Sequence, residues 1–235
     1  MTQSLLLSLR EFEALYKNWL RPKYVVFGII FLMMVYVWIH NERFVFHSDD
    51  PAWKHYETFK WWLLPHILAA ASALFLGPMQ FSERLRRRYR KLHRVLGRVY
   101  VFGALIGAPL GAFIQYRFDE RLGMSRSFSI SNVVDALLWM IPTTLGLIFA
   151  LRGKIQQHSQ WMTRSYAVAI VFLETRIVIG LSGWQASPAN FPKFEVVIWI
   201  NLAFSILLAD IAISWQDLWA TRNIAARSVA ATSSH

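Results

Sequence analysis

FSERLRRRYRKLHRVLGRVY, the stretch from Phe81 to Tyr100, carries seven arginines and one lysine against a single acid, Glu83. Long apolar runs flank it on both sides. Short loops rich in Lys and Arg stay on the cytoplasmic side of a membrane. The stretch therefore predicts a chain that crosses a membrane several times, and it also predicts which side of the membrane this connection faces.

The composition of the whole chain agrees with a membrane protein. Its 235 residues are 55% hydrophobic, with a mean hydropathy of +0.34. A membrane-spanning helix needs about 20 apolar residues. Six runs approach this length, at residues 24–39, 61–81, 99–116, 131–151, 161–182 and 196–215. We therefore predict an all-α fold, a polytopic bundle of six transmembrane helices.

The predicted organisation is one transmembrane domain with two flanking segments. The six spans make a single domain at residues 24–219. Before it, residues 1–23 place apolar side chains at helical spacing, which predicts an amphipathic helix lying on the membrane surface. After it, residues 220–235 are small and polar, which predicts a disordered cytoplasmic tail.

The distribution of basic residues predicts that both termini face the cytoplasm. The segments placed on that side hold 17 Lys and Arg, whereas the outer loops hold 7. The net charge of +11 lies mainly between apolar runs. We therefore expect anionic lipid headgroups, contacted from Arg84 to Arg98, and not nucleic acid, as the partner of this charge. The chain has no Cys, which excludes disulfides, thiolate metal sites and a Cys nucleophile.

Polar side chains within the predicted spans form the first group of candidate site residues. Such groups are costly in lipid and are functional candidates by default. In the outer half of the bundle they are His66, Asp135, Glu174, Arg176 and Asn201. They form either a ligand-binding layer or a structural network in which Arg176 is buried and pairs with an acid from another span. In the second case Asp135 is the first choice of partner.

Two histidines at the cytoplasmic side form the second group. His93 opens the third predicted span, and His158 precedes the fifth. Two histidines from different helices can ligate a haem iron axially. Gly103, Gly107 and Gly111 repeat every four residues beside His93 and could admit a flat macrocycle. The alternative is that the glycines only pack helices and the histidines only contact headgroups.

The longest outer connection also contains potential metal ligands. His47, Asp49, Asp50 and His55 lie within nine residues of one another. Their spacing matches no strong metal-binding template, so we interpret the segment as a solvated loop and predict no metal site. The chain also lacks the phosphate-binding, serine-hydrolase and zinc-protease motifs.

Three motifs occur in order along the middle of the chain. The first is His66 with GPMQF at 77–81, and the second is LHR at 92–94 with GRVY at 97–100. The third is His158 with WM at 161–162 and RSYA at 164–167, followed by Arg176. Together, over about residues 61–176, they resemble a family of bacterial predicted membrane proteins of unknown function. This resemblance implies a multi-pass protein of the bacterial cytoplasmic membrane and no established activity.

The layout is also similar to that of six-helix diheme b-type cytochromes. That similarity implies a histidine pair on the third and fifth spans, which His93 and His158 could supply. It implies a second pair on the second and fourth spans. His66 could be half of that pair, but the fourth span has no histidine. The sequence therefore departs from the diheme pattern at the outer site.

Two functional hypotheses follow from these patterns. In the first, the protein binds haem b through His93 and His158 and transfers electrons, while the outer layer binds a quinone or another small reductant. In the second, the protein binds or transports a small solute or a proton without redox chemistry. An accessory or assembly subunit that works only by contact is a further alternative.

Overall fold

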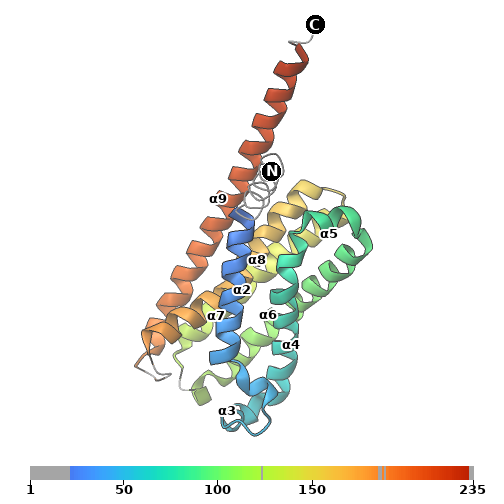
Figure 1. The fold of residues 1–235 in the computed structure, drawn as a ribbon. Helices are drawn as coiled ribbons and strands as arrows, with labels where there is room; N and C mark the ends of the chain where they lie inside the picture. Colours follow the sequence, from blue (N-terminus) through green and yellow to red (C-terminus); the bar gives the residue numbers. More distant parts are fainter. Residues whose placement is uncertain (1–21, 123, 185–186, 188, 233–235) are drawn as a thin grey trace, which may run out of the picture.

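The computed structural model describes residues 22–122, 124–184, 187 and 189–232 (Figure 1). The described chain is entirely helical, which confirms the predicted fold class. In chain order the helices are α2 (Pro22–His40), η1 (Arg43–Phe46), α3 (Ala52–Tyr56), η2 (Glu57–Phe59), α4 (Lys60–Gln80), α5 (Glu83–Arg88), α6 (Arg90–Leu122), α7 (Arg126–Leu151), α8 (Ile155–Ser182) and α9 (Phe191–Thr232). The predicted amphipathic segment, 1–23, lies outside the described residues except for its last two, which begin α2.

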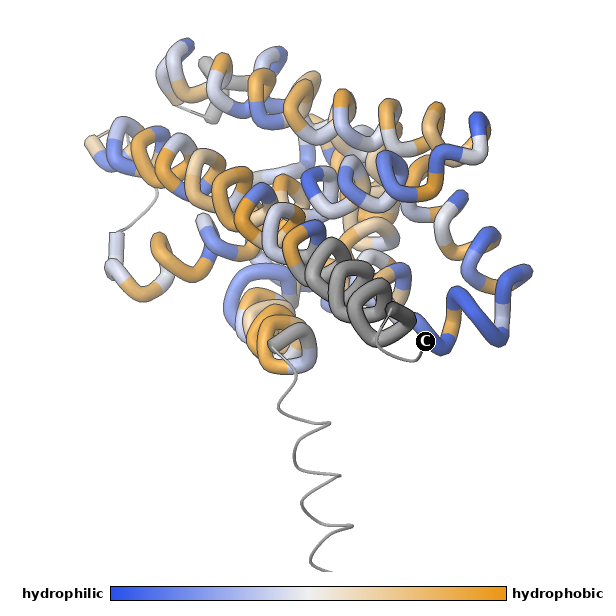
Figure 2. Tube along the Cα trace, turned by 90° about the horizontal axis from the view of Figure 1, so that it is seen from above, coloured by the Kyte–Doolittle hydropathy of each residue, from blue (hydrophilic) through white to orange (hydrophobic). Residues whose placement is uncertain are grey.

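Five helical segments of the described chain are long and apolar enough to cross a membrane: Glu57–Gln80, Arg90–Phe118, Arg126–Leu151, Ile155–Ser182 and Phe191–Trp215. They match five of the six predicted spans, with the span 61–81 ending one residue beyond its helix. The remaining span, 24–39, coincides with α2, whose apolar part, Tyr24–His40, is shorter than the other five. The long helices lie side by side with hydrophobic residues along much of their length (Figure 2).

Local chemistry explains where several helices begin and end. The Ser82 hydroxyl accepts a hydrogen bond from the backbone N–H of Leu85 and caps α5, and Ser125 caps α7 in the same way. The first turn of α5 holds Glu83 and its last turn holds three arginines, an order that suits the helix dipole. Gly183, with φ of 69°, ends α8 in a left-handed conformation that glycine adopts without strain.

The packing order of the helices follows the chain except at α2. Helix α4 packs against α6, α6 against α7, α7 against α8, and α8 against α9. Helix α2 packs chiefly against α8. Helix α8 therefore contacts α2, α4, α7 and α9. The main apolar core lies where α2, α4, α6 and α8 meet, and its buried members are Ile30, Met34, Val37, Ala73, Leu74, Tyr100, Val101, Ala104, Tyr166, Ala169 and Leu173.

The glycine-rich face of α6 is filled by α4. A Cβ added at Gly107 would meet the backbone nitrogen of Ala70 at 3.0 Å, and one added at Gly111 would meet the ring of His66 at 2.7 Å. Gly103 faces the backbone of α4 in the same way. The expectation that this face admits a macrocycle is therefore wrong. The glycines instead let two helix backbones approach closely, as small residues do in membrane bundles.

The C-terminal part of the chain differs from its sequence-based expectation. Helix α9 continues to Thr232, through most of the segment 220–235 for which we predicted disorder. In Figure 1 its last turns extend past the ends of the other helices. This segment is rich in Ala and Arg, which are strong helix formers, and it extends a helix that is already nucleated.

Candidate functional site

A line of polar side chains follows one face of α7 inside the bundle. Asp135, Trp139 and Thr143 are spaced four residues apart, so they lie above one another on one face of the helix. From Asp135 to Thr143 this face covers about 12 Å along the helix axis. Gly146 follows at the next turn, and its carbonyl oxygen accepts a hydrogen bond from the Nδ1 of His158 at 2.8 Å. The line therefore runs toward the end of the bundle that carries the basic turn, residues 82–94.

Three hydroxyl groups at the middle of this line form a buried chain. The Oη of Tyr100 lies 2.8 Å from the Oγ of Ser165, which lies 2.6 Å from the Oγ1 of Thr143. Thr143 in turn donates to the carbonyl oxygen of Trp139 at 2.7 Å. Because each hydroxyl has one proton to donate, Ser165 must donate to Thr143, and Tyr100 must donate to Ser165. Helices α6, α7 and α8 thus share one directed hydrogen-bond chain.

Several polar atoms of the bundle are buried without a partner. Within the described part of the chain, the buried side-chain atoms that have no hydrogen bond are Asn41 Oδ1, Gln80 Nε2, His93 Nδ1, Asp135 Oδ1 and Trp139 Nε1. Native proteins satisfy nearly all such groups, and each exception costs about 1–3 kcal/mol. Asp135 and Trp139 are one turn apart on the same face of α7. The Nε1 of Trp139 also faces the Tyr100 hydroxyl, outside hydrogen-bond geometry.

The basic end of the line is a group of three residues that we call the inner cluster: Gln80, His93 and His158. His158 acts electrostatically on His93, and the two histidines that the sequence singled out lie at the same end of the bundle. The side chain of Gln80 packs over Gly97, which is one turn from His93 on α6. Arg86 and Arg94 also act electrostatically on His93.

The outer candidate residues do not form one layer around Asp135. Arg176 pairs with Glu42, with 3.7 Å between Nη2 and Oε1, and its side chain is 42% exposed. The predictions that Arg176 is buried and pairs with Asp135 are therefore wrong. The reason is that α2 packs on α8, which brings the connection after α2 over Arg176.

His66 and Tyr56 lie beside this ion pair. His66 is close enough to Arg176 for their charges to interact, and its Nδ1 donates to the carbonyl oxygen of Gly107 at 2.8 Å. Burial raises the pKa of the Tyr56 hydroxyl, and the Arg176 guanidinium opposes that rise. This group closes the end of the bundle opposite the basic turn, and its geometry is that of a structural network.

The remaining outer candidates join α8 to α9. The Oε2 of Glu174 accepts a hydrogen bond from the Ser205 hydroxyl at 2.8 Å. The side-chain amide of Asn201 donates to the Thr175 hydroxyl at 3.2 Å. Of the five predicted outer residues, Asp135 is thus the one whose carboxylate keeps a buried, unpartnered oxygen among the described residues.

Sequence reasoning missed Gln80, Tyr100, Trp139, Thr143 and Ser165. All five are neutral hydrogen-bonding residues, so neither charge nor hydropathy marks them. Gln80, Tyr100 and Ser165 do stand inside the quoted motifs GPMQF, GRVY and RSYA. Their position in those motifs is the signal that could have identified them.

The residues of the site fit the haem that the sequence suggested only in part. The histidine pair is compatible with axial ligation, because the Nδ1 of His158 is held by Gly146 and leaves its Nε2 for another partner. The glycine face that was expected to receive the macrocycle is filled by α4, so it offers no slot for a flat ring. Within the described residues, no three His, Cys, Asp or Glu side chains are grouped as a metal site.

A family model described as a predicted membrane protein, DUF2306, matches residues 63–213. No curated protein and no solved structure matches the chain. The matched region begins in α4 and ends in α9, so it contains the whole line from Asp135 to the inner cluster.

Proposed function

The chain belongs to the DUF2306 family of predicted membrane proteins, and we propose that it binds a proton at Asp135 and exchanges it with the cytoplasm through the interior of the bundle. One observation carries the proposal: a carboxylate with a buried, unpartnered oxygen heads a helix face that leads to two histidines. Carboxyl, hydroxyl and imidazole groups all accept and release protons. In membrane proteins, chains of such groups mark proton paths.

Packing favours a proton over a larger solute as the transported species. Tyr100, Thr143 and Ser165 are at most 1% exposed, and their hydroxyl groups contact one another directly. A sugar, an amino acid or an organic anion would have to separate α6, α7 and α8 at this level. A proton needs only the hydrogen-bonded groups themselves, since each hydroxyl can donate and accept.

We assign a role to each part of the line. Asp135 takes up the proton in the half of the bundle opposite the basic turn. The hydroxyl groups of Tyr100, Ser165 and Thr143 form the middle of the path. For a proton to cross them, the Thr143 hydroxyl must leave the Trp139 carbonyl oxygen, which accepts a hydrogen bond but cannot pass a proton on. The inner cluster, through His93 and His158, exchanges it with the aqueous phase at the basic turn.

The proposed orientation follows the positive-inside rule. The basic turn would lie in the cytoplasm of a bacterium, with α2 as a sixth span and both termini on the cytoplasmic side. The support is the distribution of 17 against 7 basic residues between the two sides. Asp135 would then receive its proton from the outer side of the cytoplasmic membrane.

Proton flux into liposomes tests the proposal. The purified protein would be reconstituted with a pH-sensitive dye inside the vesicles, and a potassium diffusion potential would drive the flux. The wild type should carry protons above the rate of protein-free vesicles. Asp135→Asn should lower that rate by about a hundredfold or more, the scale of loss when a proton-transfer group is removed. Asp49→Asn, in the exposed connection after η1, is the matched control and should retain the wild-type rate.

Two outcomes would contradict the proposal. One is a folded wild-type protein that gives no flux above the protein-free vesicles. The other is an Asp135→Asn variant that retains the wild-type rate, since the carboxyl would then not carry the proton.

Haem-dependent electron transfer is the second candidate function. It is favoured by the positions of His93 and His158, which come from different helices and lie at the same end of the bundle. In that case a quinone or another small reductant would be the partner. An absorption spectrum of the detergent-purified protein, oxidised and then reduced with dithionite, decides between the two. Sharp bands on reduction that disappear in His93→Ala and His158→Ala would replace the proton proposal with this one.

A further inference from the structure

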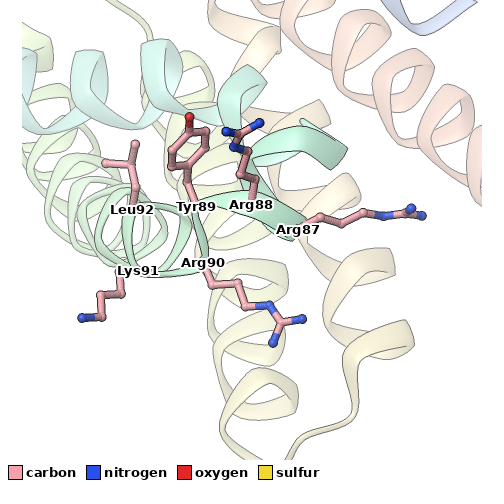
Figure 3. Close-up of a pocket in the computed structure, with 6 residues that line it drawn as sticks. All are labelled: Arg87, Arg88, Tyr89, Arg90, Lys91 and Leu92. Carbon is pink, nitrogen blue, oxygen red and sulfur yellow. The ribbon is translucent and has the colours of Figure 1, made fainter.

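The basic turn between α4 and the membrane-spanning part of α6 forms an exposed, strongly cationic surface. A surface hollow of about 460 Å³ lies on it, lined by Arg87, Arg88, Tyr89, Arg90, Lys91 and Leu92 (Figure 3). Within the described part of the chain, Arg87 alone of the four cations forms an ion pair, with Glu83 at 4.0 Å. Both partners of that pair are well exposed, so the contact contributes little. The charge of this surface is therefore available to an external partner.

An exposed apolar stripe shows where this surface lies relative to lipid. Leu92, Val95, Val99, Phe102 and Ile106 are each at least 40% exposed, and they recur every three or four residues along α6. Such a stripe on a membrane helix faces the hydrocarbon. It begins inside the basic turn, at Leu92. The cations beside Leu92 are thus held at the level where the hydrocarbon meets the headgroups.

The directions of the side chains favour many headgroups over one bound phosphate. In Figure 3 the side chains of Arg87, Arg90 and Lys91 point away from one another, and Arg88 points to the other side beside Tyr89. A single phosphate held by several cations requires them to converge. Diverging cations instead suit a surface on which each side chain meets a different headgroup, with Tyr89 as an aromatic anchor at the interface.

We propose that the basic turn is a docking surface for anionic phospholipid headgroups, and that it binds them in preference to zwitterionic ones. Cations beside an anionic leaflet gain about fivefold in affinity for each Lys or Arg. The proposal rests on the charge, exposure and lipid-facing stripe of α5 and α6. It stands independently of whether the protein carries protons.

A quenching experiment measures the preference directly. Because the chain has no Cys, Val95→Cys can carry a single fluorophore on the exposed stripe of α6. The labelled full-length protein in neutral detergent is titrated with spin-labelled phosphatidylglycerol or spin-labelled phosphatidylcholine. We expect phosphatidylglycerol to quench at a concentration at least several-fold lower than phosphatidylcholine.

Charge-neutralised variants assign the preference to the turn. R90Q/K91Q should lower the affinity for phosphatidylglycerol by roughly fivefold for each charge removed and leave phosphatidylcholine unchanged. R152Q/K154Q is the matched control, because it also removes one arginine and one lysine, here from the exposed turn between α7 and α8. Its affinity for phosphatidylglycerol should stay within twofold of that of the parent. R87Q/R88Q is a second test pair if R90Q/K91Q does not give a monodisperse protein.

Three results would overturn the proposal. Equal quenching by the two lipids would show that the surface does not select anionic headgroups. An equal loss in R152Q/K154Q would show that only the total charge matters. Displacement of the lipid by millimolar inorganic phosphate would show a single phosphate site in place of a lipid-docking surface.

Discussion

At the scale of single residues, Asp135 and Arg176 show why burial and pairing must be considered separately. Both lie in helices that can cross a membrane. Arg176 has an acid partner, Glu42, at the exposed end of the bundle. Asp135 has a buried oxygen with no hydrogen bond from any described residue. A residue that only stabilised the fold would not leave such an atom unsatisfied, since the cost is about 1–3 kcal/mol.

This difference predicts the sign of a stability change. Asp135→Ala removes an unsatisfied carboxyl group and should stabilise the protein by about 1 kcal/mol, while it abolishes proton flux. Thr143→Ala, on the same face of α7, removes a hydroxyl that both donates and accepts, and it should destabilise by a similar amount. Unfolding of both variants in detergent against wild type gives the two values. A large loss of stability in Asp135→Ala would show that this carboxylate has a structural role.

Double-mutant cycles measure how strongly Arg176 is coupled to each candidate acid partner. Because the ion pair with Glu42 is partly exposed, Arg176→Leu and Glu42→Gln should be coupled by only about 0.5 kcal/mol. The same cycle between Arg176 and Asp135 should give no coupling, since the structure does not pair them. Coupling to Asp135 that exceeds coupling to Glu42 would contradict the geometry described above.

At the scale of secondary-structure elements, the interface between α4 and α6 supports the rest of the bundle. Its close approach depends on glycines that face the backbone and the His66 ring of α4. The same interface holds His66 through the carbonyl of Gly107 and places Gln80 over Gly97. The glycine stripe therefore fixes the position of α6, and with it that of Tyr100 and His93.

Alanine substitutions distinguish glycines at a close contact between two helices from glycines that face open space. Gly107→Ala would place a Cβ 3.0 Å from the backbone nitrogen of Ala70, and a backbone atom cannot give way cheaply, so we expect a loss of about 1–3 kcal/mol. Gly28→Ala on α2 meets nothing within 4 Å and should be neutral or stabilising by up to about 1 kcal/mol. Thermal unfolding of the two variants in detergent compares them. Equal stability would contradict the tight packing of α4 on α6.

Helix α8 has the largest share of the polar contacts between elements. Its basic end pairs with α9, with 2.8 Å between Arg164 Nε and Asp210 Oδ1. Its middle supplies Ser165 to the hydroxyl chain, and its far end holds Arg176 against Glu42. The predicted site residues His158, Glu174 and Arg176 all lie on α8, and the structure adds that α2, α4, α7 and α9 all contact this one helix.

At the scale of the whole molecule, orientation decides what the polar line connects. If the basic turn faces the cytoplasm, Asp135 lies in the outer half of the membrane and the inner cluster lies at the cytoplasmic surface. The direction assigned to the proton depends on this arrangement. The side on which the N-terminal end of α2 lies depends on whether this helix, the shortest of the apolar helices described, crosses the membrane.

Cysteine labelling in whole cells tests the orientation without background, since the native chain has no Cys. Arg88→Cys in the basic turn should react with a membrane-impermeant maleimide only after the cells are opened. Asp49→Cys, in the connection after η1, should react in intact cells. Tyr24→Cys reports on α2 and should behave like Arg88→Cys if that helix crosses. External labelling of Arg88→Cys would invert the proposed direction.

Much of the architecture was determined by the sequence itself. Membrane-spanning helices are specified by local properties, namely the length of each apolar run and the charge of the connections. The apolar runs therefore predicted the all-helical fold and the apolar parts of the five long helices of the described chain. The same local reasoning identified His93 and His158 as a candidate pair, because both directly precede an apolar run at the same end of the bundle.

The partners of the polar side chains were decided only by the tertiary structure. Lipid solvates every apolar helix face equally well, so hydropathy does not specify which faces turn toward one another. That choice placed α2 on α8 and gave Arg176 the partner Glu42. It also filled the glycine face of α6 with α4, which removed the space expected for haem. Finally, the choice of contacting faces placed Asp135 in line with the hydroxyl chain and the inner cluster. This alignment depends on how α6, α7 and α8 are each rotated about their own axes.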